Sequence, residues 1–191
     1  MSTYSPVELE QLGFKNIGNN VHISRKASFY GIERISIGSH VRIDDFCVIS
    51  AGNGGIYLGN YIHIAVHSTI IGAGAVRLAD YCNISARVSI YSSNDDYSGE
   101  FMTNPMIDPL YTNVQHEPVT LEKHVVIGAG SVVLPGVTIK EGSAVGALSL
   151  VNNSLPSWGV YAGQPVKFRK KRNQGLLQKE QAFIATVGGK F

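Results

Sequence analysis

The sequence lacks three features that would each decide its class: a long apolar run, a set of cysteines and a large net charge. Among its 191 residues no apolar stretch approaches the roughly 18 residues of a membrane-spanning helix, and the N-terminus has no signal-peptide core. A net charge of +2 is too small to indicate a nucleic-acid-binding protein. We therefore expect a cytoplasmic single domain that binds neither membrane nor nucleic acid.

Cysteine is scarce, since the chain has only Cys47 and Cys82. Two isolated cysteines provide neither a disulfide framework nor the ligand set of a zinc site. Both occupy the fifth position of the repeat described next, where small residues prevail. We interpret them as buried thiols that act as small apolar side chains.

What the sequence has instead is an internal repeat of six residues. Isoleucine, leucine or valine opens almost every unit between residues 17 and 156, as in the unit IGAGSV at residues 127–132. The units begin at residues 17, 23, 29, 37, 43, 49, 58, 64, 70, 78, 84, 90, 121, 127, 133, 139, 145 and 151, in six groups of three. A fixed period of this kind decides the architecture before any single motif is considered.

Six residues are too few for a helix or for two strands, so each unit supplies one short strand and a turn. Three units then close one coil, and six coils stack about 4.8 Å apart into a triangular prism of parallel strands. The first residue of each unit and the smaller fifth residue point into the prism, because side chains alternate along a strand. The small fifth residues are Val21, Ala27, Cys47, Ser68, Cys82, Val88, Ser131 and Ser143.

The same register assigns the outward residues of each face. The second face is polar, with His22, Arg42, His63 and Asn83 before the inward aliphatic residues and Ser24, Asp44, Ala65 and Ser85 after them. The third face is apolar, with Val48, Ile71, Val132, Leu134 and Leu150 pointing outward. Because an exposed apolar stripe usually marks a protein contact, we predict the subunit interface on this third face.

Over residues 17 to 170 the repeat resembles that of the hexapeptide-repeat acyltransferases. The resemblance implies an all-β fold, a left-handed parallel β-helix assembled as a homotrimer. The left hand comes from the resemblance alone, because parallel crossovers are otherwise right-handed in about 98% of cases. We predict one domain over residues 1–191, with a β-helix at 17–156, an inserted loop at 91–117 and a closing segment at 157–191.

Short helices are predicted at both ends of the chain. Ser5, Pro6 and Glu8 form a capping box with proline at the first helical position, so residues 6–12 should form a helix over the mouth of the prism. A second helix is predicted from about Leu176 to Val187. Neither helix indicates chemistry.

A basic cluster follows the last repeats, at Lys167 and at residues 169–172, directly after the run VYAGQPV. One interpretation is a solvated basic segment. The family resemblance implies instead that this run closes the last coil of an acetyl-coenzyme A-dependent enzyme, whose basic residues meet the coenzyme's phosphates. The donor-site candidates are then Ala129, Gly130, Ala147, Ser149, Gly163, Pro165, Lys167 and Arg169.

The loop at residues 91–117 interrupts the repeat and is rich in aromatic and other apolar residues. Loops longer than about 15 residues are uncommon in compact domains and are usually functional. We expect this loop to fold over a neighbouring subunit and shape the acceptor pocket. In galactoside- and maltose-type members of the family, a histidine near its start deprotonates a sugar hydroxyl. Here that histidine is missing, and Asn94 or Asp95 takes its place.

The missing histidine favours an amine over a hydroxyl acceptor. A hydroxyl with a pKa near that of water, about 15.7, needs an aligned base to attack a thioester. A free α-amine has a pKa of about 7.7 to 8, so a tenth or more is already neutral at pH 7. Carboxylates such as Asp95 and Glu100 suffice to hold an ammonium group and accept its proton.

These features resemble the small N-acyltransferases that act on nucleotide-linked aminodeoxy sugars. The resemblance implies N-acetylation with acetyl-coenzyme A as cosubstrate, without a metal, in surface-polysaccharide, O-antigen or lipopolysaccharide synthesis. Ser85 and Asp95 would border the acceptor nitrogen, with Glu100 as a third group and Asp95 as the base. A backbone amide or Ser85 would stabilise the oxyanion. Each of the three side chains is also compatible with a structural role, such as a turn cap at Asp95.

Three other interpretations remain open. His116, or His63 on the face that carries Ser85, could be the base of a sugar O-acetyltransferase. A γ-type carbonic anhydrase shares the prism, but His63 and His67 lie on opposite sides of a turn and a zinc site needs a third histidine. A non-catalytic β-helix is the third alternative, because fold does not fix function.

Overall fold

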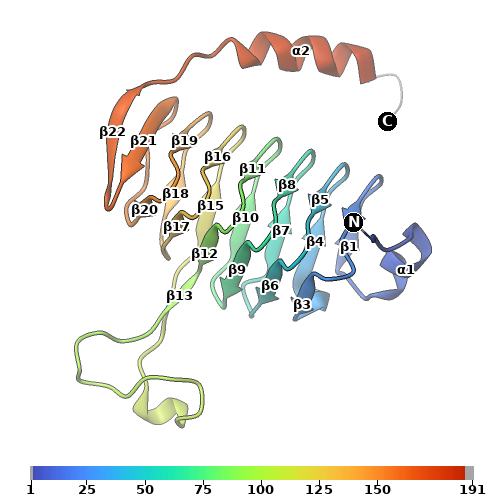
Figure 1. Cartoon of the computed structure of the whole chain (residues 1–191). Coiled ribbons are helices and arrows are strands. Elements are labelled where there is room, and N and C mark those ends of the chain that lie inside the picture. Colours follow the sequence, from blue (N-terminus) through green and yellow to red (C-terminus); the bar gives the residue numbers. More distant parts are fainter. Residues whose placement is uncertain (1, 188–191) are drawn as a thin grey trace.

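A computed structural model of the chain describes residues 2–187, and Figure 1 shows the triangular solenoid that the period predicts. Its strands form three parallel sheets, one for each face of a left-handed β-helix. The first sheet contains β1 (Asn16–Ile17), β4 (Ile35–Ile37), β7 (Ile56–Leu58), β10 (Val76–Leu78), β15 (Val119–Leu121) and β18 (Thr138–Ile139). The second contains β2 (His22–Ile23), β5 (Arg42–Ile43), β8 (His63–Ile64), β11 (Asn83–Ile84), β16 (Val126–Ile127) and β19 (Ala144–Val145). The third contains β3 (Ser28–Tyr30), β6 (Val48–Ala51), β9 (Thr69–Gly72), β12 (Ser89–Tyr91), β17 (Val132–Val133) and β20 (Leu150–Val151).

The first residues of the repeat units align along each sheet, as predicted. In the second sheet Ile43, Ile64 and Ile84 are partners on successive coils, and none of them is exposed. Branched aliphatic side chains suit strands that are packed on one face. A slip of one residue would turn all of them outward, so the core fixes the register.

The eight small fifth residues are buried, as predicted, and several of them also join neighbouring coils. The hydroxyl of Ser68 donates to the carbonyl of Ser85 at 3.0 Å, and the thiol of Cys47 donates to the carbonyl of Ala65 at 3.2 Å. Burial raises the pKa of Cys47 to about 11 and the pKa of Cys82 to about 12. Both thiols therefore stay protonated and serve the packing.

The corners of the prism are built by the fourth residue of each unit, most of which adopt the left-handed backbone region. At the first corner, between the first and second sheets, the rings of His40, Tyr61, Tyr81 and His124 stack with centroids 4.5 to 5.2 Å apart. A left-handed residue other than glycine costs roughly 1–2 kcal/mol. Ring stacking contributes about 0.5–1.5 kcal/mol per pair, so it offsets much of that cost.

The two ends of the prism are closed differently. Helix α1 (Pro6–Gln11) has the predicted capping box between Ser5 and Glu8, and its Leu9 is buried with the core. At the other end the β-helix continues beyond the predicted limit at residue 156. Strand β21 (Gly159–Gly163) pairs in parallel with β19 and adds part of a seventh coil, and β22 (Val166–Lys171) returns antiparallel beside it. The aliphatic period could not show this, because the last coil lacks a complete set of three units.

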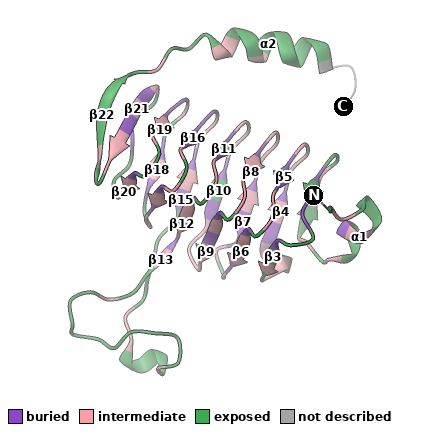
Figure 2. Cartoon of the chain, in the orientation of Figure 1, coloured by how far each residue is buried: buried purple, intermediate pink, exposed green. Residues whose placement is uncertain are grey.

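The inserted loop leaves the third face between β12 and β15 and projects away from the prism (Figure 1). Its base is a two-stranded ladder of β13 (Ser93–Asn94) and β14 (Gln115–His116). Two short 3-10 turns, η1 (Ile32–Arg34) and η2 (Pro109–Tyr111), lie in the connections, the second of them within this loop. Most of the loop is exposed (Figure 2), including Tyr97 at 85% and Met106 at 90%. These apolar side chains are not covered by any other part of residues 2–187.

Helix α2 (Leu176–Val187) lies along the first corner, where Glu180 contacts two side chains of the fifth coil. A carboxylate oxygen of Glu180 lies 2.5 Å from Lys123 Nζ, and the other lies 2.8 Å from His124 Nε2. Phe183 packs edge-on against Tyr61. Gln181 and Ile184 are exposed, because the helix turns Glu180 and Phe183 toward the prism.

Glu180→Gln is predicted to loosen α2 without unfolding the prism. Burial acts to raise the pKa of Glu180, but the bonds from Lys123 and His124 outweigh it and hold the pKa below the ordinary value. The stabilisation is therefore complete above the ordinary glutamate pKa and is lost as pH falls through the lowered one. Loss of the charge should cost about 1 kcal/mol, so α2 amides should exchange about five-fold faster at pH 7. Hydrogen exchange of the wild type, of Glu180→Gln and of the control Lys179→Gln measures this, and equal α2 rates in all three would contradict it.

Candidate active site

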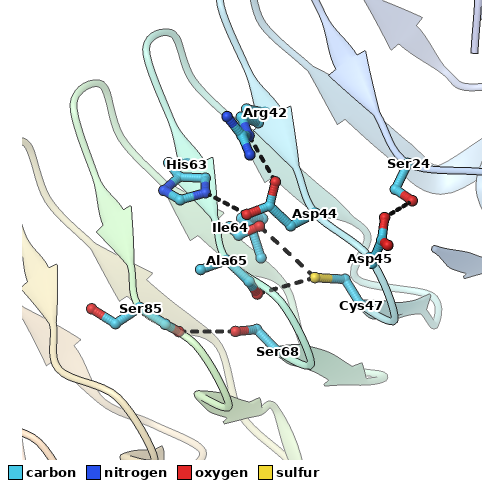
Figure 3. A network of polar contacts seen from close by, with 10 residues as sticks. All are labelled: Ser24, Arg42, Asp44, Asp45, Cys47, His63, Ile64, Ala65, Ser68 and Ser85. Carbon is cyan, nitrogen blue, oxygen red and sulfur yellow. Dashed lines mark hydrogen bonds and ion pairs between the residues drawn. The ribbon is translucent and has the colours of Figure 1, made fainter. Parts of the chain in front are cut away.

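The second face carries the predicted ladders of outward residues. Arg42, His63 and Asn83 are partners on successive strands, and Ser85 follows Asn83 by two residues on the same face. Ser85 is half-buried, and its carbonyl accepts the bond from Ser68 (Figure 3). Ser24 departs from the prediction, because it is fully buried and donates to the carboxylate of Asp45.

Asp44 links two of these ladder residues. One of its carboxylate oxygens lies 2.7 Å from Arg42 Nε, and the other lies 2.8 Å from His63 Nε2 (Figure 3). Burial acts to raise the pKa of Asp44, but the bonds from His63 and Arg42 outweigh it and hold the pKa below its usual range. The sequence placed Asp44 and His63 on one face but did not reveal this pairing, which depends on two adjacent coils.

The candidate residues of the inserted loop fall into two groups. Asp95 and His116 line one pocket of about 530 Å³, together with Asn104, Ile107, Pro109 and other loop residues. His116 Nδ1 lies 2.7 Å from the hydroxyl of Ser93, which also accepts the amide of Ala73. Glu100 is exposed and is not among the residues that line this pocket.

Ser85 and Asp95 lie on different sides of the chain. Ser85 stands on the second face, whereas Asp95 belongs to the loop that leaves the third face, and Ser85 does not line the Asp95 pocket. The expected pair is therefore not assembled within one copy of the described chain.

The donor candidates occupy the second corner of the last coils and the hairpin of β21 and β22. Gly130 makes room for Leu148, because a Cβ atom on Gly130 would lie 2.8 Å from Leu148 Cδ2. Ala129 and Ala147 precede these two residues in successive coils, and the amide of Leu148 donates to the carbonyl of Ala129. These small residues keep the backbone close to the surface there.

Ser149 departs from the expectation that it lines a pantetheine arm. Its side chain is buried, with 2% exposed, and the hydroxyl donates to the carbonyl of Gly146 while it accepts the amide of Gly163. The fifth position of the unit turns it into the prism. It holds the last two coils together instead.

The basic cluster also divides in two. Lys167 and Arg169 on β22 are exposed next to Gly163 and Pro165, and Arg169 donates to the carbonyl of Ala162. Arg172 instead turns back to the prism, where its Nη1 donates to the carbonyls of His124 and Gly142 at 2.9 Å each. Four of the five basic residues thus remain available to an anionic ligand.

The histidines considered for zinc are engaged in different contacts. His63 is bound to Asp44, and His67 stacks on Phe46 at the second corner. Within residues 2–187 no group of three metal-ligating side chains comes together.

In the same part of the chain, neither helix has the length and apolar character to cross a membrane.

Comparison with known proteins finds similarity over nearly the whole chain. The dTDP-4-amino-4,6-dideoxy-D-glucose acyltransferase of Escherichia coli is 53% identical over 189 residues, which cover 99% of this chain and 98% of that protein. The chain belongs to the hexapeptide-repeat acyltransferases. No protein-family model matches it. A second Escherichia coli protein, WbbJ, whose name ascribes to it O-acetyl transfer in lipopolysaccharide biosynthesis, is 32% identical over 78% of this chain and 75% of its own length.

A solved structure agrees over the same length. AntD, an N-acyltransferase from Bacillus cereus, superposes with a TM-score of 0.92 at 42% identity, over 98% of each chain, in its complex with dTDP and 3-hydroxybutyryl-coenzyme A. Other AntD structures contain coenzyme A with dTDP or with dTDP-4-amino-4,6-dideoxyglucose, in variants of one serine or of an aspartate ten residues after it. AntD therefore shares the fold over nearly the whole chain, and its structures contain both a coenzyme and a nucleotide.

Arg172→Ala is predicted to destabilise the fold, whereas Lys171→Ala is not. The carbonyls of His124 and Gly142 would lose a charged donor, which should lower the free energy of unfolding by about 1–3 kcal/mol. Urea denaturation of both variants and the wild type measures the difference. Equal midpoints for Arg172→Ala and Lys171→Ala would show that Arg172 has no structural role.

Proposed function

We propose that this protein transfers an acyl group from acyl-coenzyme A to the amino group of a nucleotide-linked aminodeoxy sugar. The observation that carries the proposal is the near full-length similarity to a dTDP-amino sugar acyltransferase and to AntD in complex with both kinds of ligand. The loop supports it, because an aspartate stands where a hydroxyl-activating histidine was expected. The reaction belongs to surface-polysaccharide synthesis in the cytoplasm.

The acceptor site contains Ser85 and Asp95. They stand ten residues apart, as do the serine and the aspartate replaced in AntD, which supports the pair. Asp95 holds the acceptor ammonium and accepts its proton, and the neutral amine attacks the thioester carbonyl carbon. Ser85 or a backbone amide stabilises the oxyanion until the thiolate of coenzyme A leaves and takes up the proton that the attacking nitrogen loses as the amide forms. Glu100 is a weaker candidate because it is exposed outside the Asp95 pocket.

The enzyme acts as a homotrimer whose sites lie between subunits. Ser85 and Asp95 face different sides of one chain, so Ser85 of one subunit would complete the site with the loop of another. The exposed loop side chains Tyr97 and Met106 support an arm that reaches across. The third-face residues Val48, Ile71, Val132, Leu134 and Leu150 are half-buried and fit an interface.

Acyl-coenzyme A lies along the second corner of the last coils. Gly130, Ala129 and Ala147 border the pantetheine arm, with Gly163 and Pro165 at the end of the prism. Lys167 and Arg169 meet the coenzyme's phosphates, for which exposed basic side chains are suited. Ser149 contributes from within, because its hydroxyl fixes the amide of Gly163.

A second candidate is sugar O-acetylation, favoured by the position of His116 in the same pocket as Asp95. His116 would then deprotonate a hydroxyl, as the loop histidine does in galactoside-type enzymes. His63, held by Asp44, is the other histidine available to that reaction.

Thiol release from acetyl-coenzyme A separates the two candidates. We expect release with nucleotide-linked amino sugars and none with thiogalactosides or maltose, because a hydroxyl needs an aligned histidine-type base, whereas a carboxylate such as Asp95 suffices to take the proton of an ammonium group. Release with the plain hydroxyl acceptors would establish O-acetylation and assign the base role to His116 or His63.

Asp95→Asn should reduce turnover ten-fold or more while leaving the Kd of coenzyme A unchanged, since general-base losses are roughly 10² to 10⁴. Asp96→Asn is the matched control, because Asp96 bonds only to Ser98 and Gly99 among residues 2–187. Steady-state kinetics and isothermal titration give the two quantities. Unchanged turnover in Asp95→Asn would remove Asp95 from the mechanism.

A further inference from the structure

The second corner of the prism carries a row of side chains with no role so far. In four successive coils its fourth-position residues are Lys26, Phe46, His67 and Arg87. The rings of Phe46 and His67 stack with centroids 5.0 Å apart and planes 13° apart, and Lys26 Nζ lies 5.2 Å from the Phe46 centroid. The amide of Arg87 donates to the carbonyl of Val66, which places Arg87 on the next coil. Two stacked rings therefore lie between two cations.

This stack is open, whereas the similar stack at the first corner is covered. There, Phe183 packs on Tyr61, and Glu180 leaves His124 only 8% exposed. At the second corner Phe46 is 49% exposed. An exposed surface with stacked rings is suited to binding a ligand or another protein surface.

The charges on these coils favour an anionic partner. Asp44 is paired with Arg42 and His63. Asp45 accepts bonds from Ser24 and from Lys26, whose Nζ lies 3.3 Å away. Arg87 is exposed and forms no side-chain hydrogen bond or ion pair with residues 2–187. The carboxylates are thus neutralised, and the unpaired cation stands at the end of the row that is closest to Ser85.

We propose that the second corner from Lys26 to Arg87 binds the nucleoside diphosphate of the acceptor. Arg87 meets the diphosphate with its guanidinium fork, and the edges of Phe46 and His67 contact the base. The proposal rests on the proposed function, which places the acceptor amine at Ser85, two residues before Arg87. In a nucleotide sugar the amino group and the diphosphate are substituents of one ring. A sugar bound at Ser85 therefore brings its diphosphate within reach of the same turn.

The two substrates then approach the fourth coil from opposite directions. Beyond Arg87 the corner changes to Gly130 and Leu148, which carry no charge and suit a pantetheine arm. Before it, the corner carries rings and cations. The corner side chains therefore change in character between the fourth coil, which carries Ser85 and Arg87, and the fifth coil, which carries Gly130. Acyl transfer is proposed at Ser85, next to this change.

Isothermal titration with dTDP, without coenzyme or sugar, tests the assignment. Arg87→Ala should raise the Kd about ten-fold or more, and Phe46→Ala about five-fold or more. Arg87→Lys should restore part of the affinity. Arg77→Ala and Tyr30→Ala are the matched controls, because they remove an exposed arginine of the same coil and an exposed ring on other faces. The controls should bind dTDP like the wild type, and all variants should bind coenzyme A unchanged.

Wild-type affinity for dTDP in both Arg87→Ala and Phe46→Ala would overturn the proposal. It would also fall if Phe46→Ala changed the mass of the assembly in light scattering, because the corner would then be a contact between copies of the chain. A failure of the proposed function gives a different result. If the wild type binds dTDP through Arg87 and Phe46 but releases no thiol with any amino sugar, the nucleotide site stands and the proposed acyl transfer is wrong.

Discussion

Every part of this protein depends on the packing of aliphatic side chains inside a narrow prism. Ile43, Ile64 and Ile84 stack in one column, and burying each such side chain contributes about 1.5–3 kcal/mol. The free energy of this burial offsets the cost of the left-handed backbone conformation at the corners. Because the core fixes the register, it also fixes which side chains face outward, and hence where any chemistry can occur.

The outward surface is divided by position along the prism. The first corner is covered by α2, which binds through Glu180 and Phe183, and it takes no part in the proposed reaction. The second corner remains open and changes from rings and cations to small apolar residues at the fourth and fifth coils. In every coil the fourth residue of a unit projects outward at a corner. At the first corner these residues bind helix α2, and at the second corner we propose that they bind substrate.

The fold was predictable because its period is local. Each unit repeats an aliphatic first residue, so strands, faces and inward fifth positions follow from the sequence. The partial coil at β21 did not follow, since it is built by pairing with β19 rather than by a full set of units. The burial of Ser24 did not follow, because its register position faces outward and its small hydroxyl turns inward to the carboxylate of Asp45. Ser149 is buried as its fifth position implies, and only the family resemblance placed it beside the pantetheine arm.

The candidate site was less predictable than the fold. Ser85 follows from the register and Asp95 from its place in the loop, but the six-residue period stops at residue 91 and says nothing about the path of that loop. Arg172 looked like its basic neighbours and proved to be a structural donor, because only the fold brings the carbonyls of His124 and Gly142 to it. Arg87 was overlooked although its fourth position in the unit was readable, since no motif includes it.

The most direct test of the account is a crystal structure with coenzyme A and a dTDP-linked amino sugar bound together. We predict that the coenzyme thiol and the sugar amine meet beside Ser85, with the loop Asp95 of a neighbouring subunit at the amine. Ligands that meet on the first or third face, or an amine remote from both Ser85 and Asp95, would contradict the account.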